Sequence, residues 1–474
     1  MSAAEHGLAR AVARIRSRLG DEAIREGGAA APYMAEPRGL FPGRGEVVVR
    51  PADTAGVAEA VAICADEGVA IVPQGGRTGT VGGATARHAG EITLSLERLD
   101  RVRAVDAEDG LMTVEAGCTL AQVQQEAARA GAFFPLRLAS EAECRVGGNL
   151  ATNAGGLNVL RYGDARALTR GLEVVLADGR VWRELQGLRK DNAGYDLRDL
   201  FIGSEGTLGV ITAATLRLLP PWRSRRVALL ALEEPGAALP LVRATEAESG
   251  GAVTAAELMS AEALAMGQAL PETPETPLPG AAWYLLLELA SADPRAQLDE
   301  ALGAALEPAQ ERGRVMDAVV APTEDAAERM WRLRTAIPDG QKHAGASIKH
   351  DISVLPRDIA AFIPRALAAV RAVDPEVRPC VFGHVGDGNL HFNLTQPRGS
   401  DPETFLRQQA HYNEAVHEVV RAFSGSIAAE HGVGQLRRAE LQRTADPVRR
   451  ELMGRLKRAL DPGAILNPGK GVVD

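Results

Sequence analysis

Hydrophobic positions in the first part of the chain have the spacing of a helix followed by a buried strand. The helix is expected to have Thr54 as its N-cap and Gly68 just beyond its C-terminal end. Its apolar face would consist of Val57, Ala60, Val61 and Cys64. A short strand over Val69–Pro73 then leads into a glycine-rich stretch. Ahead of all this, residues 1–45 are expected to form a helical lead-in and a Gly/Pro-rich loop.

Beyond the helix the pattern becomes that of antiparallel strands. Residues 92–116 alternate as strands do, with a turn at Glu108–Gly110. Thr119 is expected to cap a helix that ends at Gly131, and Leu172–Trp182 has a hairpin pattern. A β-α-β unit followed by antiparallel strands predicts an α+β fold rather than a regular Rossmann alternation.

Pro220-Pro221 marks a boundary, after which strands and helices alternate to about residue 420. This alternation predicts a second sheet with helices on one face. Expected strands are Val227–Leu232, Trp283–Leu289, Val315–Ala321, Ser347–Leu355 and a hairpin over 380–395. Expected helices include Glu324–Ala336, Asp358–Val373 and Pro447–Leu460. Leu270–Pro279 is proline-rich and is expected to be an exposed loop.

Composition and charge narrow the class of protein. With 474 residues we expect two or three domains, and a net charge of −9 argues against a nucleic-acid partner. The four cysteines form no CxxC pair, which indicates a reducing compartment rather than a disulfide framework. No apolar run approaches the roughly 20 residues of a membrane span, and no secretory signal is visible. We therefore expect a cytoplasmic protein, with peripheral attachment to the inner membrane left open.

Glycine-rich stretches supply the first candidate chemistry. Gly75–Gly83 follows a predicted strand, and its glycines would let backbone N–H groups approach a pyrophosphate. The loop is neither GxGxxG nor a Walker A motif, so a mobile connection is the alternative. Gly147–Gly156 is dense in Gly, Asn and Thr, which suits wrapping a dinucleotide. Lys190–Leu197 and Phe201–Ile211 are further clusters of this kind, and each has a plain turn as its alternative.

Two histidines define the second candidate site. His384 and His391 flank a Gly-Asp-Gly turn that would fold two short strands back on each other, and Glu430 could join them from a distant segment. A His2Glu set suits zinc or another divalent first-row metal and leaves a coordination position for substrate. The alternative is a pair of ordinary core or surface histidines. We expect Asp387 to shape the turn, and Asn393 to lie on the same strand face as His391.

Taken together, these motifs resemble the FAD-binding PCMH-type flavoproteins of the vanillyl-alcohol oxidase superfamily. The resemblance is strongest to the branch containing D-2-hydroxyglutarate dehydrogenase, D-lactate dehydrogenase and the glycolate oxidase flavin subunit. It implies a PCMH-type FAD-binding domain with two subdomains over residues 46–221. A ferredoxin-like α+β cap domain for substrate would follow over 222–425, and a helical C-terminal segment, 426–474, would return to the flavin.

The resemblance also implies FAD as the cofactor. Some superfamily members tether FAD through a histidine in the Gly-rich loop; this loop has none, so we expect FAD to be bound non-covalently. The residues implied to bind it are Pro73, Gly75, Gly76, Arg77, Thr78, Gly79, Gly82, Gly83, Ser140, Gly147, Gly148, Asn149, Thr152, Asn153, Gly155, Glu205, Gly209, Ile211 and Asn467.

For the second site the resemblance assigns a role to each polar residue. Zinc or manganese would be held by His384, His391 and Glu430, with iron as a further option. His431 would be the catalytic general base. The residues implied to hold substrate carboxylates are Arg334, Lys349 and Asn393. From the sequence alone, ordinary solvated charges are the better interpretation of Arg334 and Lys349.

The implied reaction is oxidation of a D-2-hydroxy acid to the 2-oxo acid, with hydride passing to the flavin and the proton to His431. The sequence His391-Phe392-Asn393 favours a hydroxyglutarate-like substrate, because lactate and glycolate members tend to have proline just after that histidine. Pro338 departs from the hydroxyglutarate pattern, which has threonine four residues after the arginine.

Several alternatives stay open at this point. D-lactate or glycolate could be the substrate, with the chain acting as the flavin subunit of a larger complex. A redox-neutral enzyme like alkyl-dihydroxyacetone-phosphate synthase and a metallohydrolase without flavin are the others. We expect an electron-transfer flavoprotein or a quinone as the electron acceptor, and a homodimer as the default assembly.

Overall fold

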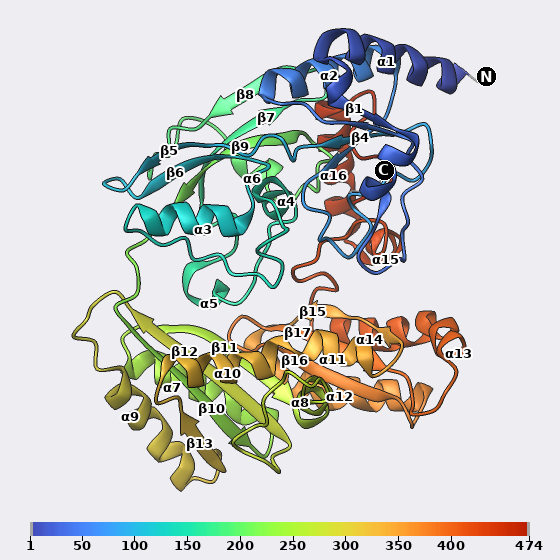
Figure 1. Cartoon of the computed structure of the whole chain (residues 1–474). Coiled ribbons are helices and arrows are strands. Elements are labelled where there is room, and N and C mark those ends of the chain that lie inside the picture. The colour runs from blue at the N-terminus through green and yellow to red at the C-terminus, as the bar shows by residue number, and fades with distance from the viewer. Residues whose placement is uncertain (1–2, 472–474) are drawn as a thin grey trace. The chain divides into compact units, whose positions relative to one another are not determined.

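The computed structural model describes residues 3–471, and the chain divides into two compact units. Unit 1 comprises Met1–Gly156, Gly163–Pro221 and Glu430–Asp474, within the described residues. Unit 2 comprises Leu157–Tyr162 and Trp222–Ala429. Both units mix helices with sheets, which confirms the α+β fold class (Figure 1). No helix within residues 3–471 is long and apolar enough to cross a membrane.

Unit 1 begins with a four-stranded sheet of strand order β1-β2-β4-β3. Its strands are β1 (Ile24–Glu26), β2 (Val47–Val49), β3 (Ile71–Gln74) and β4 (Ile92–Ser95). The parallel strands β2, β4 and β3 are buried, and helices α1 (Ala3–Leu19) and α2 (Thr54–Glu67) pack on them in one hydrophobic core. The lead-in is thus more than a helix and a loop, because β1 pairs with β2.

The start of α2 differs from the prediction by one residue. Asp53 is the N-cap, since its carboxylate accepts a hydrogen bond from the backbone N–H of Gly56 at 2.8 Å. Thr54 is instead the first helical residue, and its hydroxyl donates to the buried carboxylate of Glu173 at 2.6 Å. At the other end, Gly68 has a φ of 65° and closes the helix as predicted.

A five-stranded antiparallel sheet of order β5-β6-β9-β7-β8 forms the other half of unit 1. Its strands are β5 (Val102–Asp106), β6 (Leu111–Glu115), β7 (Thr169–Val175), β8 (Val181–Glu184) and β9 (Val210–Arg217). The predicted strands and the hairpin between β7 and β8 are confirmed. The short helices that accompany this sheet are α3 (Leu120–Arg129), α4 (Val146–Ala151) and α6 (Arg198–Phe201).

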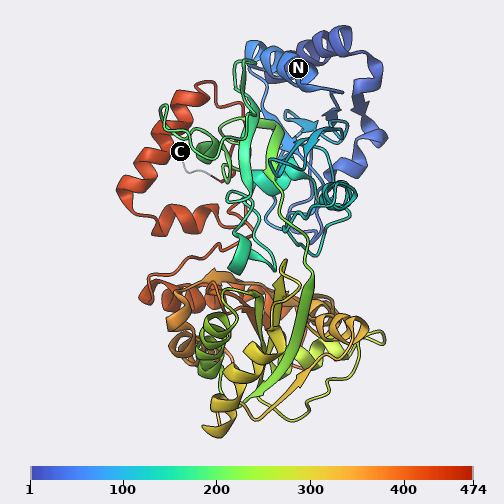
Figure 2. The ribbon, with the colours of Figure 1, turned by 90° about the vertical axis from the view of Figure 1, so that its left-hand side faces the viewer.

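The C-terminal part of unit 1 returns to the first sheet. Helices α15 (Arg438–Thr444) and α16 (Pro447–Leu460) are followed by a stretch in which Leu466 bridges to Ile71 of β3 (red in Figure 2). The bounds of α16 are those predicted, and Asp446 caps it. Lys457 fixes the exit from the helix by donating to Asp461 and to the carbonyl of Leu466.

Unit 2 is built on one eight-stranded sheet with the path β13-β10-β12-β11-β16-β17-β14, and β15 also pairs with β17. The strands are β10 (Ser224–Leu232), β11 (Val253–Ser260), β12 (Trp283–Ser291), β13 (Asp317–Val320), β14 (Ser347–Ile348), β15 (Asp351–Ser353), β16 (Arg378–His384) and β17 (Asn389–Thr395). The expected strand over 347–355 is therefore two short strands that break at residues 349–350.

Helices cover both faces of this sheet, so the prediction of helices on one face is wrong (Figures 1 and 2). One core lies under α7 (Ala238–Glu248), α9 (Leu298–Glu311), α12 (Ile359–Val373), α13 (Pro402–Arg407) and α14 (Gln409–Ala422). The opposite core lies under α8 (Ala261–Gln268), α10 (Glu324–Thr335) and α11 (Ile337–His343). The short helix α5 (Val159–Tyr162) also belongs to unit 2.

Candidate functional site

A hollow in unit 1 collects most of the residues predicted to bind the cofactor. Two glycine-rich segments far apart in the chain, Gly75–Gly79 and Gly147–Gly148, line it together, and Gly75 packs against the backbone of Gly148. The predicted residues that line it are Pro73, Gly75, Gly76, Arg77, Thr78, Gly79, Gly83, Gly147, Gly148, Asn149, Thr152, Glu205, Gly209, Ile211 and Asn467. His431, predicted as the catalytic base, lines the same hollow.

Four predicted cofactor residues do not line it: Gly82, Ser140, Asn153 and Gly155. Asn153 has a φ of 52° and turns its amide to Asp164 and to the backbone N–H of Arg166. The carbonyl of Ser140 accepts from the backbone N–H groups of residues 143 and 144. These residues shape the turns around the hollow. The Lys190–Leu197 cluster does not line it either, and Tyr195 there is 94% exposed.

The hollow fits a dinucleotide. No atom lies within 4 Å of where a side chain would start at Gly79 or Gly148, so the space in front of these backbones is open. At Gly76 a side chain would begin 2.0 Å from the carbonyl oxygen of Glu143, so only glycine is accommodated there. Arg77 and Arg145 add positive charge for an anionic pyrophosphate. Arg145 was missed by the sequence reasoning, although it stands two residues before Gly147.

Glu205 is the acidic residue of the lining, and its carboxylate is turned to the backbone. Its two oxygens accept hydrogen bonds from the N–H groups of Val433 and Gly434, each at 2.7 Å. Burial raises the pKa of Glu205, and these hydrogen bonds act against that shift. Glu205 thereby holds the segment that carries His431 beside the hollow.

Asn467 closes the hollow from the C-terminal side. Its side-chain amide donates to the carbonyls of Gly83 and Glu205 at 3.0 and 2.7 Å. The buried Lys470 donates to the amide oxygen of Asn467 at 2.9 Å, and burial lowers the pKa of Lys470 to about 7. Asn467 therefore ties the C-terminal segment to Gly83 and Glu205, and the return of this segment to the flavin stays a prediction.

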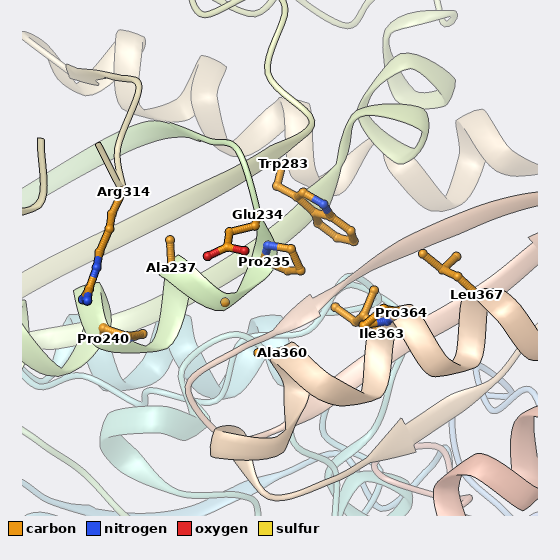
Figure 3. Close-up of a pocket in the computed structure, with 11 residues that line it drawn as sticks. Glu234, Pro235, Ala237, Pro240, Trp283, Arg314, Ala360, Ile363, Pro364 and Leu367 are labelled. Atoms are coloured by element: carbon orange, nitrogen blue, oxygen red, sulfur yellow. The ribbon is translucent and has the colours of Figure 1, made fainter. Parts of the chain in front are cut away.

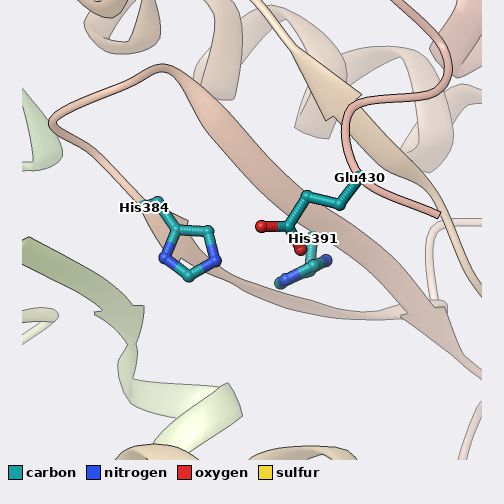
Figure 4. A group of neighbouring side chains, drawn as sticks. All are labelled: His384, His391 and Glu430. Carbon is teal, nitrogen blue, oxygen red and sulfur yellow. The ribbon is translucent and has the colours of Figure 1, made fainter. Parts of the chain in front are cut away.

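The second candidate site lies on the β16–β17 hairpin of unit 2. Asp387 accepts from the N–H of Asn389 and shapes the turn as predicted, and His391 stands opposite Phe382 in the register. The rings of His384 and His391 are 5.9 Å apart. Glu430, the residue that follows the end of unit 2 in the chain, offers a carboxylate oxygen to this pair (Figure 4). Ligand atoms of the three residues lie within 4.8 Å of one another.

Each imidazole has a buried carboxylate behind it. Glu257 of β11 accepts a 2.5 Å hydrogen bond from Nδ1 of His384, and Asp351 of β15 lies 3.9 Å from Nδ1 of His391. Asn389 holds Asp351 by donating to it at 3.0 Å. A carboxylate on the far nitrogen fixes the tautomer and the orientation of a ligand histidine. The donor set and its support therefore fit a divalent metal.

Arg334 of α10 reaches the same site. Its Nε donates to Glu257 at 2.6 Å, and its guanidinium carbon lies 4.6 Å from the ring centre of Phe382. Burial opposes the charged form of Glu257, but His384 and Arg334 outweigh it and lower the pKa of this carboxyl to about 2. Among the described residues, no group accepts a hydrogen bond from the two Nη groups of Arg334, although the side chain is only 6% exposed.

The other two predicted substrate residues lie nearby. Burial raises the pKa of the Cys380 thiol to about 12, and the positive charges of Lys349 and Arg334 act against this shift. Asn393 is buried and pairs with Cys380 in the hairpin register. Its amide donates to Gln341 and accepts from the N–H of His350, so part of its hydrogen-bonding capacity is used within the protein.

Unit 2 has another hollow, away from all of the predicted site residues. It lies beside η4 (Pro235–Ala237), with Trp283 and residues of α12 on its wall (Figure 3). Glu234 and Arg314 are the charged residues in its lining, and both are exposed. None of its lining residues is a predicted site residue, so we assign this hollow no part in the site.

Two protein-family models match the chain. The FAD binding domain family matches residues 45–184, and the C-terminal domain of FAD linked oxidases matches residues 222–471. A D-2-hydroxyglutarate dehydrogenase of Xanthomonas citri pv. viticola is 37% identical over 85% of this chain and 84% of that protein. The mitochondrial D-2-hydroxyglutarate dehydrogenase of Bos taurus is 38% identical over 90% of this chain and 77% of that protein.

Solved structures agree on the fold. The p-cresol methylhydroxylase structure with substrate bound has a TM-score of 0.80 at 19% identity, over 99% of this chain and 98% of that one. An alkyldihydroxyacetonephosphate synthase has a TM-score of 0.72 at 16% identity, over 97% and 84%. The chain therefore belongs to the FAD-linked oxidase family, within the vanillyl-alcohol oxidase fold, and is an FAD-dependent dehydrogenase.

Proposed function

We propose that this protein oxidises D-2-hydroxyglutarate, or a close D-2-hydroxy diacid, to the 2-oxo acid, with a divalent metal bound by His384, His391 and Glu430. Relatives that are 34–38% identical to this chain over most of its length have names that specify D-2-hydroxyglutarate. The observation that supports the proposal best is that Glu430 and His431 are consecutive. One joins the paired imidazoles and the next lines the flavin hollow.

When bound, FAD supplies the hydride acceptor, and the metal supplies a Lewis acid that lowers the pKa of a substrate hydroxyl. The protein's residues would do the rest. His431 would take the hydroxyl proton, which requires its neutral form. Arg334 would offer its two Nη groups as a fork to the distal carboxylate, and Lys349 would add a second cation. Asn393 is proposed to hold the substrate through what remains of its amide capacity.

A diacid is favoured over D-lactate or glycolate because Arg334 is buried with hydrogen-bond donors to spare. A buried guanidinium without enough acceptors is costly, so its position is best explained by an anionic ligand. Pro338, in the first turn of α11, provides no hydroxyl to assist Arg334. We therefore expect the distal carboxylate to be held mainly by the two cations.

Dye-coupled turnover with a panel of acids tests the substrate class. The panel is D-2-hydroxyglutarate, its L enantiomer, D-malate, D-lactate and glycolate. We expect kcat/KM for D-2-hydroxyglutarate to exceed that for D-lactate by roughly 100-fold or more, because one charged hydrogen-bonded contact contributes about 1.5–3 kcal/mol and two cations are available. Equal or better use of D-lactate would overturn the diacid assignment.

The redox-neutral alternative rests on a likeness that shows only the fold, since that structure is 16% identical. Turnover without an electron acceptor would favour it. The electron acceptor, an electron-transfer flavoprotein or a quinone, stays a prediction. So do the homodimer and a location in the cytoplasm or at the inner membrane.

A further inference from the structure

One buried carboxylate joins the two halves of the unit 2 site. Glu257 lies in β11, paired with Leu286 on one side and with His384 on the other. Its oxygen Oε1 accepts from Nδ1 of His384 at 2.5 Å, and Oε2 accepts from Nε of Arg334 at 2.6 Å. The side chain is completely buried, so no water competes for either oxygen.

The contacts continue round to the other imidazole. The guanidinium of Arg334 lies over the ring of Phe382, and that ring is 4.9 Å from the ring of His391. His391 is in turn 5.9 Å from His384. Glu257 and Phe382 therefore hold Arg334 from two directions, each of them also touching a candidate metal ligand.

From this arrangement we propose that Glu257 is a positioning residue. It fixes the distance between the metal ligands and Arg334, the arginine that would bind the distal carboxylate, and so selects the length of the substrate. The inference rests on the proposed function and deepens it. Glu257 acts on both the metal ligand and the arginine. Because a carboxylate only accepts, Nδ1 of His384 must carry the hydrogen, and Nε2 presents its lone pair to a metal. The second oxygen sets the direction in which the fork of Arg334 points.

A single substitution separates this role from simple packing. Glu257→Gln keeps the shape but leaves one acceptor oxygen for two donors, Nδ1 of His384 and Nε of Arg334. One of the two contacts must therefore break, and an amide N–H turned to His384 would favour the wrong tautomer. Glu257→Asp keeps both acceptor oxygens but is one methylene shorter, so it should retain more of the function than Gln does.

Glu288 provides a matched control. It is also a buried glutamate, in the neighbouring strand β12, and also holds a side chain of α10, accepting from Nε1 of Trp331 at 2.7 Å. It also accepts hydrogen bonds from Arg225 and Thr254. Glu288→Gln should therefore disturb the packing of α10 to a similar extent without acting on His384.

The first readout is zinc affinity, measured by chelator competition on metal-stripped holoenzyme, with flavin content and thermal unfolding to monitor the fold. We expect Glu257→Gln to weaken zinc binding by roughly 10- to 100-fold, the usual effect of losing a residue behind a ligand histidine. The zinc affinity of Glu257→Asp should lie between those of the wild type and Glu257→Gln, and Glu288→Gln should bind zinc as the wild type does. Equal losses in Glu257→Gln and Glu288→Gln would mean that only packing is affected, and would overturn the proposal.

The second readout is the ratio of kcat/KM for D-2-hydroxyglutarate to that for D-lactate. We expect this ratio to fall by roughly tenfold in Glu257→Gln, because only the diacid needs Arg334 in its place. An unchanged or increased ratio would show that Glu257 does not position Arg334 for the diacid, and would overturn the proposal. If the wild type itself bound no zinc and oxidised no hydroxy acid, the proposed function would fail as well. Failure of the Glu257 inference alone leaves both wild-type properties intact.

Discussion

Glu430 and His431 are consecutive residues, yet Glu430 joins the two imidazoles of the β16–β17 hairpin and His431 lines the hollow that we assign to the flavin. Glu205 holds this segment through the N–H groups of Val433 and Gly434. A carboxylate that would fix substrate and a base that would deprotonate it are thus delivered by one short piece of chain.

Replacing His384 with alanine should remove the metal without removing the flavin. The purified variant should stay yellow and lose bound zinc or manganese. Its turnover should fall by more than roughly 100-fold, which is the usual upper effect of replacing a residue that hydrogen-bonds a metal ligand. Metal analysis and the flavin-to-protein ratio measure this directly. His411, an exposed histidine of α14, provides the control, and His411→Ala should leave both metal and turnover unchanged. Full activity in His384→Ala would contradict a metal role.

Gly148→Ala tests the flavin hollow. The added methyl group meets no protein atom within 4 Å, so the fold should be retained. It would instead enter the space assigned to the dinucleotide and weaken FAD binding by about 1–3 kcal/mol, the usual cost of overpacking. Gly303→Ala in α9 also meets no atom and should keep normal FAD affinity. Equilibrium dialysis of both variants provides the comparison, and normal affinity in Gly148→Ala would place the cofactor elsewhere.

Glu205→Ala should loosen the segment that carries Glu430 and His431. Two partly buried backbone N–H groups would lose their acceptors, at a cost of at most about 1–3 kcal/mol each. We expect faster tryptic cleavage at Arg437 or Arg438, together with a fall in kcat. Mapping of the first cleavage sites by mass spectrometry checks this. Cleavage at the wild-type rate would show that other contacts suffice to hold the segment.

The stability of unit 1 should depend on pH through Glu173. Burial opposes the charged form of this carboxyl, but hydrogen bonds from Arg103, Thr54 and Arg183 outweigh it and lower its pKa from 4.5 to about 2. A lowered pKa in the folded state means that the stabilisation is complete above pH 4.5. It is lost as the pH falls from there toward about 2.

Glu173→Gln isolates this contribution. The variant should unfold more easily at pH 7 by about 1–3 kcal/mol, with a weaker dependence on pH below 4.5 than the wild type. Urea unfolding at a series of pH values measures both quantities. A variant whose acid sensitivity matches that of the wild type would show that other carboxylates dominate.

The sequence predicted the local features that depend on a few neighbouring residues. The β16–β17 hairpin follows from strand-forming residues on either side of a Gly-Asp-Gly turn, and α16 has the bounds that the sequence predicted. The glycine-rich segments line one hollow, and their role in binding the cofactor stays a prediction. Strand β11 was missed because Ala255–Met259 consists mostly of residues with helical preference. It is a strand because it is buried between β12 and β16.

Missing β11 also meant missing Glu257, since nothing local marks a glutamate in a helix-like sequence as the partner of a histidine 127 positions later. The same holds for the faces of the unit 2 sheet. An alternation of strands and helices indicates that the helices pack on the sheet, but the face on which each helix packs depends on the strand order. That order is set by contacts distant in sequence.

The most direct test of the central claim is anaerobic mixing of the holoenzyme with D-2-hydroxyglutarate while the visible absorption of the flavin is followed. The same mixing is repeated after removal of metal with EDTA and after zinc or manganese is restored. We predict rapid bleaching of the flavin, a loss of rate of at least roughly 100-fold without metal, and recovery on its return. Bleaching at the same rate in metal-free enzyme, or no bleaching by D-2-hydroxyglutarate at all, would contradict a metal-assisted dehydrogenase of this acid.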